Sequence, residues 1–327
     1  MTVPGRMLRP LLVRLLRSLL VMFGISVLVF LIFFATPGAD PAARLAGRGA
    51  SEETLAAVRA EYGLDRPLPI QYAVLMRRLF ISRDLPSFIN RGQLVVPDVL
   101  RAAPVTLSLA AGAAVLWLAA GLGIGLLAAA REGGPADRLA TALGLVGVSV
   151  PVFWLGEVVN LLTQSRLHDT WAFRWVPPLG YVSLLHDPGA WFRALVLPWT
   201  TLALLYAGVY GRVLRASLIH AYRQDYIRTA RAKGVSEARV LLRHALRNAL
   251  VSVIALFGLD IGALIGGGTL LTEVVFGLRG IGKLTYDALQ NLDLPVVMAS
   301  VLYASFFVVL ANAAVDGVLA LLDPRRR

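Results

Sequence analysis

The chain has 327 residues, of which 57 % are hydrophobic and 16 % are charged, and it contains no cysteine. A typical soluble domain is about 45–50 % apolar and about 25 % charged, so this composition excludes a disordered chain, a disulfide scaffold and most soluble enzymes. It indicates a polytopic membrane protein. The net charge of +12 comes almost entirely from arginine, and arginine on the cytoplasmic face of such a protein explains it without nucleic acid.

Six apolar stretches are long enough to cross a bilayer, whose hydrocarbon core is spanned by about 20 helical residues. They predict an all-α membrane protein with six transmembrane helices. An even number of spans places both termini on the same side. The predicted spans are residues 18–39, 102–130, 139–165, 194–211, 248–272 and 294–315.

The first span is open to a second interpretation, which is a cleaved signal peptide. Its apolar stretch is longer than the usual 7–15 residues of such peptides, so we expect an uncleaved anchor. The segment that follows, residues 40–101, carries a helix-capping pattern that begins at Ser51 with the letters SEET. We therefore expect part of this segment to be helical, with Ser51 as the N-cap residue.

The placement of arginine predicts the orientation of the chain. The segment 212–247 has nine basic residues against two acidic ones, and basic residues also gather in residues 1–17 and 323–327. These three segments are predicted to be cytoplasmic, which gives an N-in/C-in topology. The segment 40–101 would then be extracytoplasmic, although it carries nine arginines beside seven acidic residues.

Two acidic residues, Glu157 and Asp260, fall inside predicted spans. An ionisable group costs about 3 kcal/mol or more at the bilayer centre, which makes each a candidate for a functional site. Both are candidates for lining a translocation pathway, where they would meet an ammonium group. Pairing with an arginine of a partner protein and a position near the membrane surface remain open.

A run of glycines at 258, 262 and 266–268 gives the fifth span a face of small residues. Small residues at this spacing allow close helix contact. Contact with a partner chain, flexing and plain packing are all compatible with it.

Several segments resemble catalytic motifs but lack a required residue or spacing. Residues 277–284 nearly form a phosphate-binding loop, but Leu284 replaces its hydroxyl residue, so we interpret the segment as a glycine-rich turn. The four histidines are scattered, and residues 147–151 lack the final glycine of a nucleophile elbow. The sequence predicts no catalytic residue, no metal site and no enzyme activity of the chain itself.

The most informative segment is the long predicted cytoplasmic loop, residues 212–247. Its pattern predicts two helices, 216–233 and 236–246, which are hinged at Gly234, with Ser236 as an N-cap residue. Such a shape fits either docking to a partner protein or contact with anionic lipid headgroups.

Residues 225–236 read DYIRTARAKGVS, and this string resembles the "EAA" loop of ABC-transporter permease subunits in its dipeptide/oligopeptide/nickel branch. Arg228 and Thr229 replace the first two residues of the general Glu-Ala-Ala pattern, as that branch commonly has them. Further pieces resemble the same branch in the same order along the chain. They are TPGADP at 36–41, YGLDRPL at 62–68, LP at 197–198, EVVF at 273–276 followed by GIG at 280–282, and LDPR at 322–325.

This resemblance implies the fold of a type I ABC importer permease, with its core at residues 102–322. It implies a second homologous permease subunit, two cytoplasmic ATPase subunits that bind ATP and Mg, and an extracytoplasmic substrate-binding protein. No cofactor is expected in this chain. The implied location is the plasma membrane of a bacterium or archaeon.

The implied function is ATP-driven import of dipeptides or oligopeptides by alternating access, with nickel or another small solute as the alternative. An ATP-independent secondary transporter is the alternative from a different class. The resemblance assigns coupling to the ATPase to one set of loop residues. They are Asp225, Tyr226, Arg228, Ala230, Lys233, Gly234 and Val235.

In these roles, small Ala230 and Gly234 would allow close approach of the ATPase. Arg228 and Lys233 would pair with acidic groups on it.

Overall fold

The computed structural model describes residues 5–34, 41–47, 49–90 and 92–322. Within these residues the regular elements are helices, apart from one isolated bridge between Pro86 and Leu94. The prediction of an all-α protein is therefore confirmed. Motif residues 36–40 and the tail 323–327 lie outside the described part of the chain.

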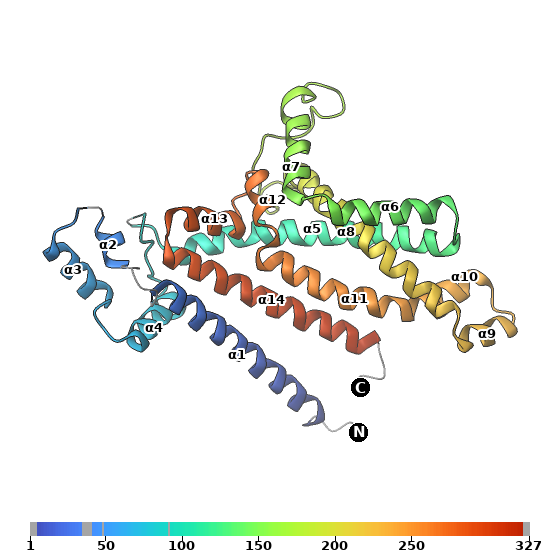
Figure 1. Cartoon of the computed structure of the whole chain (residues 1–327), viewed down its shortest axis with the longest axis horizontal. Coiled ribbons are helices and arrows are strands. Elements are labelled where there is room, and N and C mark those ends of the chain that lie inside the picture. Colours follow the sequence, from blue (N-terminus) through green and yellow to red (C-terminus); the bar gives the residue numbers. More distant parts are fainter. Residues whose placement is uncertain (1–4, 35–40, 48, 91, 323–327) are drawn as a thin grey trace. The chain divides into compact units, whose positions relative to one another are not determined.

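The N-terminal third begins with the long helix α1 and continues through short helices to the start of α5 (Figure 1). The elements are α1 (Gly5–Phe34), α2 (Pro41–Ala46), α3 (Glu52–Tyr62), α4 (Leu68–Arg77), the π-helix η1 (Arg78–Ser82) and α5 (Val95–Ala130).

The middle of the chain contains the remaining elements of the predicted third and fourth spans and of the loop that follows them. They are α6 (Pro135–Ser149), α7 (Val152–Leu161), η2 (Leu162–Arg166), α8 (Pro188–Tyr222), α9 (Asp225–Ala232), α10 (Glu237–Arg239) and η3 (Val240–Ala245). The C-terminal part holds α11 (Leu246–Ala263), η4 (Leu264–Gly268), α12 (Leu270–Val275), α13 (Ile281–Asn291) and α14 (Leu294–Leu322).

Four of the described helical runs are long and apolar enough to cross a membrane. They are α5, α8, the run Glu237–Gly268 and α14, while α1 has a shorter apolar stretch at Leu16–Ile32. Each long run overlaps a predicted span, so an all-helical membrane fold with at least four long apolar helices is established.

The third predicted span, residues 139–165, is not one continuous helix. The helix α6 ends at Ser149, and Pro151 has an extended backbone with ψ 132° before α7 begins. Proline lacks the N–H that a helix interior needs, and it disfavours helical geometry in the residue before it. The prediction of an unbroken helix is wrong at this point.

The chain divides into two compact units, each with its own core. The first comprises residues 1–104 and 280–309, and the second comprises 105–279 and 310–327. In the first unit, Phe30 of α1 packs with Leu75 of α4, Leu79 of η1 and Met298 of α14.

Within the first unit, the segment before α5 is tied to α14 through a buried carboxylate. Asp293 is 4 % exposed and accepts hydrogen bonds from the Ser87 hydroxyl and from the Phe88 N–H, the latter at 3.1 Å. A buried charge is tolerated when hydrogen bonds replace water. Ser51 caps α3 as predicted, since its hydroxyl accepts from the Thr54 N–H at 3.2 Å.

The core of the second unit is built around α8, along which α6 and α11 pack (Figure 1). Trp117 of α5, Leu202 and Leu214 of α8 and Val253 of α11 are buried in it. Glycine permits the close approach of α6, because a Cβ on Gly147 would overlap the carbonyl oxygen of Leu205.

The small-residue face of α11 is used for packing inside the second unit. A Cβ on Gly258 would lie only 2.6 Å from Cγ1 of Val315 in α14. Among the interpretations left open by the sequence, the structure therefore supports intramolecular packing at this glycine. Farther along the run, Gly267 has a non-helical φ of 148° and marks a kink in η4.

Candidate functional site

The candidate site is the segment between α8 and α11. The prediction of a single helix over 216–233 is wrong, because α8 ends at Tyr222 and α9 begins only at Asp225. Gln224 is extended there, with ψ 150°. An aspartate in the first turn favours the start of a new helix, since it opposes the positive end of the helix dipole.

The second predicted helix of the loop, 236–246, also differs in detail. It begins at Glu237 after an extended Ser236, but the Ser236 side chain makes no capping hydrogen bond. From Val240 it widens into the π-helix η3 and continues directly into α11 (Figure 1). This helix is therefore the first part of the next span.

The hinge predicted at Gly234 is confirmed and has a defined geometry. Gly234 has φ +74°, in the left-handed region that glycine adopts at low cost. The Gly234 N–H donates to the Arg231 carbonyl at 2.9 Å, and the Val235 N–H donates to the Ala230 carbonyl at 3.2 Å. These two bonds form a Schellman motif, which satisfies the last carbonyls of α9.

The inner face of α9 holds it against the second unit. Ile227 and Ala230 are buried in the core of that unit, and Val235 packs against the same core. At one end, the Tyr226 hydroxyl accepts a hydrogen bond from the Asn248 amide at 2.8 Å. The position of α9 is thus fixed by apolar burial and by a bond to α11.

The outer face of α9 carries charge. Asp225 and Arg228 form an ion pair at 3.3 Å on the surface, with side chains 94 % and 75 % exposed. Such an exposed pair adds little stability. Lys233, which caps the C-terminal end of α9, is also exposed, so both predicted basic contacts are available to a partner.

A second ion pair spans the turn at Gly234, and it was not predicted from the sequence. The Arg231 guanidinium donates to both oxygens of Glu237, at 2.7 and 3.0 Å, and lies 5.4 Å from the centre of the Tyr222 ring. The Glu237 carboxylate raises the pKa of Arg231. This bidentate pair connects α9 to α10 across the Gly234 turn.

The seven predicted coupling residues thus lie together on α9 and its C-terminal turn. Two of them are less exposed than the rest, because Ala230 faces the core and Val235 packs against it. The structure adds Ile227 as the anchor and Arg231 with Glu237 as the clamp. Ile227 had a detectable signal in the helical periodicity of the loop. The Arg231–Glu237 clamp had no such signal in the sequence. Side chains six residues apart come together only when a turn of suitable geometry lies between them.

Near the start of α6, Asp137 forms a tie to α8. Its carboxylate accepts from Arg215 at 2.7 Å and from the Gly133 N–H at 2.9 Å. The Arg215 guanidinium, followed by the Gly133 bond, holds the pKa of Asp137 below its ordinary value. The turn after α5 is thereby joined to the helix that leads into α9.

The two acidic residues predicted inside spans have different surroundings. Glu157 is exposed on α7, so the structure gives it no buried site within this chain. Asp260 is half-buried on α11, and it accepts a hydrogen bond from the Tyr210 hydroxyl of α8 at 2.8 Å.

Aromatic rings surround the Tyr210 end of this hydrogen bond. Trp117 stacks on Tyr206 with ring centroids 4.7 Å apart, and it lies 6.0 Å from Tyr210 and 5.8 Å from Phe257. Trp117 and Tyr210 are fully buried, whereas Asp260 is not. Asp260 therefore places a carboxyl group at the accessible edge of an aromatic cluster.

A buried acid that the sequence interpretation did not single out is Glu273 in the first turn of α12. It is fully buried and accepts a hydrogen bond from the Thr106 hydroxyl of α5 at 2.6 Å. Nearby, the Asn160 amide donates to the Val275 carbonyl at 2.7 Å and joins α7 to α12. Glu273 belongs to the EVVF string, which was the only signal available.

In the part of the chain that the structure describes, no three His, Cys, Asp or Glu side chains gather into a site for a metal ion. The near phosphate-binding segment, residues 277–284, consists of a turn with Gly277 at φ 63° followed by the first residues of α13. Its lysine, Lys283, donates to Asp287 at 3.2 Å.

Comparison with protein families gives two matches that together cover most of the chain. Residues 121–327 match the family described as "Binding-protein-dependent transport system inner membrane component". Residues 7–110 match the corresponding N-terminal family, "Binding-prot-dependent transport system membrane comp, N-term".

Similar proteins cover nearly the full length. A putative peptide transport system permease protein of Brucella abortus (strain 2308) is 40 % identical over 314 residues, covering 96 % of this chain and 97 % of that protein. The probable D,D-dipeptide transport system permease protein DdpB of Escherichia coli (strain K12) is 36 % identical, covering 94 % of each chain. The glutathione transport system permease protein GsiC of Pectobacterium atrosepticum is 35 % identical, covering 96 % and 97 %.

Among solved structures, a crystal structure of an amino acid ABC transporter with histidines matches 70 % of this chain and 94 % of its own, with a TM-score of 0.45 and 17 % identity. The family assignment rests on the sequence matches. The chain belongs to the binding-protein-dependent transport system inner membrane components and is a multi-pass membrane permease subunit of an ABC importer, without an ATPase site of its own.

Proposed function

We propose that this permease couples ATP hydrolysis on two partner ATPases to the import of peptides, and that α9 is the coupling helix. The observation that carries the proposal is the two-sided build of α9. Its inner face is anchored by Ile227 and Ala230, while Arg228 and Lys233 stand on its outer side. A helix held in this way can transmit a push from a partner into the membrane helices.

The proposed assembly contains this chain, a second homologous permease subunit, two ATPases and an extracytoplasmic binding protein. ATP and Mg would be bound by the ATPases. Closure of the ATPase pair would rock the permease pair between inward-facing and outward-facing states, with the substrate site near the middle of the membrane.

The proposed topology has six spans with both termini in the cytoplasm. The arginines of the loop between α8 and α11 support it, because short cytoplasmic loops carry an excess of basic residues. The chain has no cysteine, so single cysteines report sidedness without background. A cysteine at Lys233 is expected to react with an impermeant maleimide only from the cytoplasmic side, and one at Arg174 only from the opposite side.

The proposed cargo is a peptide, and the proposed contact is Asp260. The names of the similar proteins refer to peptides, D,D-dipeptides and glutathione. A carboxylate beside aromatic faces suits an ammonium group, which is attracted both by charge and by the ring quadrupoles. Nickel or another small solute remains the alternative cargo, and Glu157, which is exposed on α7, is the second pathway candidate.

The cargo proposal is tested by uptake into proteoliposomes that contain the whole complex. Asp260→Asn is expected to reduce uptake of a dipeptide with a free amino terminus by about tenfold, the cost of one charge-assisted contact. Uptake of the N-acetylated dipeptide should change little. Equal loss for both peptides would indicate that Asp260 serves assembly or gating, and no loss would remove it from the pathway.

The coupling proposal is tested by purifying the complex from native membranes in mild detergent. Mass spectrometry should identify a second permease and two ATPases with the wild-type chain. Arg228→Glu is expected to release the ATPases while the partner permease is retained, and Arg174→Glu on a different loop serves as the matched control. Retention of the ATPases by Arg228→Glu would contradict the assigned role of this arginine. Recovery of the chain alone would favour a secondary transporter.

A further inference from the structure

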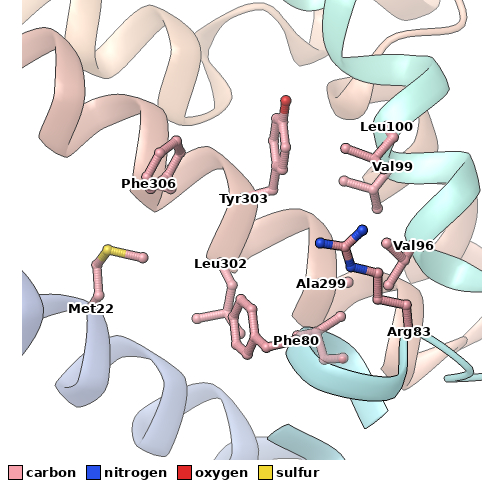
Figure 2. Close-up of a pocket in the computed structure, with 11 residues that line it drawn as sticks. Met22, Phe80, Arg83, Val96, Val99, Leu100, Ala299, Leu302, Tyr303 and Phe306 are labelled. Carbon is pink, nitrogen blue, oxygen red and sulfur yellow. The ribbon is translucent and has the colours of Figure 1, made fainter. Parts of the chain in front are cut away.

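The first unit contains an apolar cavity of about 410 Å³, a size typical of ligand sites. Its walls come from α1, η1, α5 and α14 (Figure 2). Nearly all of the lining side chains are aliphatic or aromatic, and Tyr303 supplies the one hydroxyl. Phe80, Leu100 and Phe306 on the rim are each about half exposed, so the cavity opens on the surface of the unit.

One charged side chain lines this cavity, and it is Arg83. Figure 2 shows the Arg83 side chain extending toward Ala299 and Tyr303, with Met22 of α1 on the opposite side. Among the residues that the structure describes, no carboxylate forms an ion pair with Arg83. The neighbouring Asp84 instead accepts a hydrogen bond from the Ser82 hydroxyl at 2.6 Å.

The backbone at Arg83 is itself unusual. Arg83 has φ +57°, a left-handed conformation that a residue with a long side chain rarely adopts, and it directly follows the π-helix η1. Both features occur frequently at functional sites, where they aim a side chain in a particular direction. Here they aim the guanidinium into the apolar cavity.

The lining residues lie at distances from the helix ends that correspond to about one leaflet of a bilayer. Along α14, the lining residue Phe306 lies 12 residues from the helix start at Leu294, which is about 18 Å at 1.5 Å per residue. Along α1, Met22 lies 12 residues before the helix end at Phe34, which gives the same distance of about 18 Å from that end. Half of a hydrocarbon core of about 30 Å is about 15 Å.

We infer that this cavity binds a phospholipid, with one acyl chain along the apolar walls and the phosphate on the Arg83 guanidinium. An amphiphile with one anionic group and a long apolar tail matches both the charge and the lining of the cavity. A transmembrane helix is about 10–12 Å wide with its side chains, so a partner helix would contribute only a few side chains. None of the lining residues belongs to α9, and Asp260 is not among them, so the inference does not depend on the transported substrate.

The inference is tested on the whole transporter complex by native mass spectrometry with added phosphatidylglycerol. Arg83→Gln is expected to weaken retention of one lipid per permease by about tenfold, the loss of one charge-assisted contact. Arg83→Lys should retain part of the binding. The control Arg77→Gln removes an exposed arginine that does not line the cavity and should leave binding unchanged.

Further measurements distinguish the contribution of the phosphate to binding from that of the acyl chain. Leu100→Trp, which adds bulk at the rim, is expected to reduce lipid retention as Arg83→Gln does. Diacylglycerol, which lacks the phosphate, should compete poorly, and so should inorganic phosphate, which lacks the tail. Equal retention by wild type and Arg83→Gln would overturn the inference, and so would equal competition by either compound.

The occupant is identified by cross-linking. Because the chain has no cysteine, Phe80→Cys accepts a single photoreactive label at the rim of the cavity. The expected product is an adduct with phospholipid. A cross-link to the partner permease in its place would show that a protein surface fills the cavity and would refute the inference.

Discussion

The geometry at Gly234 allows a prediction in which backbone conformation is separated from side-chain contact. Gly234 has φ +74°, and a Cβ placed there would meet no atom within 4 Å. Any effect of Gly234→Ala must therefore come from the backbone. Gly234→Asn serves as the matched variant, since asparagine adopts the left-handed conformation much more readily than alanine.

The size of the effect follows from two opposing contributions. A left-handed backbone costs an L-residue roughly 1–2 kcal/mol. Replacing glycine by alanine returns about 0.4–1 kcal/mol, because the unfolded segment loses conformational freedom. The net destabilisation of the turn in Gly234→Ala is about 1 kcal/mol, which lowers the ratio of formed to open turns about fivefold. Gly234→Asn should lie near the wild type.

The assay is amide hydrogen exchange of residues 228–236 in the purified complex. The Val235 N–H, which donates to the Ala230 carbonyl, should exchange about fivefold faster in Gly234→Ala and at nearly the wild-type rate in Gly234→Asn. Gly123→Ala is the control, since Gly123 lies within α5 with space for a Cβ. Equal exchange in Gly234→Ala and Gly234→Asn would refute the backbone argument. If α9 is the coupling helix, ATPase stimulation should follow the same order.

Three other predictions test ties within the second unit. Asp137→Asn is expected to lower the melting temperature at pH 7. Arg215 depresses the folded-state pKa of Asp137, so the stabilising contribution of this carboxylate is present above the ordinary pKa of 3.8 and is lost as the pH falls below it. Thermal unfolding of the wild type and of Asp137→Asn across pH should therefore show a difference in melting temperature that shrinks in acid. Exchanging the charges of the clamp, Arg231→Glu with Glu237→Arg, should restore the exchange protection of the loop that Glu237→Gln weakens, and no recovery would contradict a pairwise role. Gly258→Ala should cost about 1–3 kcal/mol of unfolding free energy through overpacking, and adding Val315→Ala should recover part of it.

The apolar helices were predictable from the sequence because the length of an apolar stretch is enough to indicate them. It failed at Pro151 and at Gln224, where a local backbone preference interrupts a helix without a change in hydrophobicity. The π-helix η3, which joins the loop to α11, was also not predicted from the sequence. No pattern of residue types in 240–245 distinguishes it from an ordinary helix.

The candidate site was predictable only where a single residue carries the signal. Gly234 has a conformational signature that is visible in a single residue, and the structure agrees with it. The buried carboxylates Glu273 and Asp293 were not recognised, because their partners are distant in sequence. Thr106 lies 167 residues from Glu273, and Ser87 lies 206 residues from Asp293. Only the fold brings these pairs together.

The connectivity of the second unit gives the Tyr210–Asp260 hydrogen bond a particular place in the proposed coupling. The loop that contains α9 joins the end of α8 to the start of α11, and the same two helices carry Tyr210 and Asp260. Tyr210 lies 12 residues from the end of α8, which is about 18 Å along the helix. A displacement of α9 that shifts one helix along the other must therefore change this 2.8 Å bond.

Tyr210→Phe removes only the hydroxyl from this contact. We expect it to lower peptide uptake per ATP hydrolysed while ATPase binding stays at the wild-type level, because the docking face of α9 is untouched. The measurement is the ratio of uptake to phosphate release in proteoliposomes. Trp199→Phe is a suitable control, since Trp199 is also buried on α8 and donates a hydrogen bond to the Ser108 carbonyl, away from Asp260. An unchanged ratio in Tyr210→Phe would show that α9 acts on the pathway without this bond.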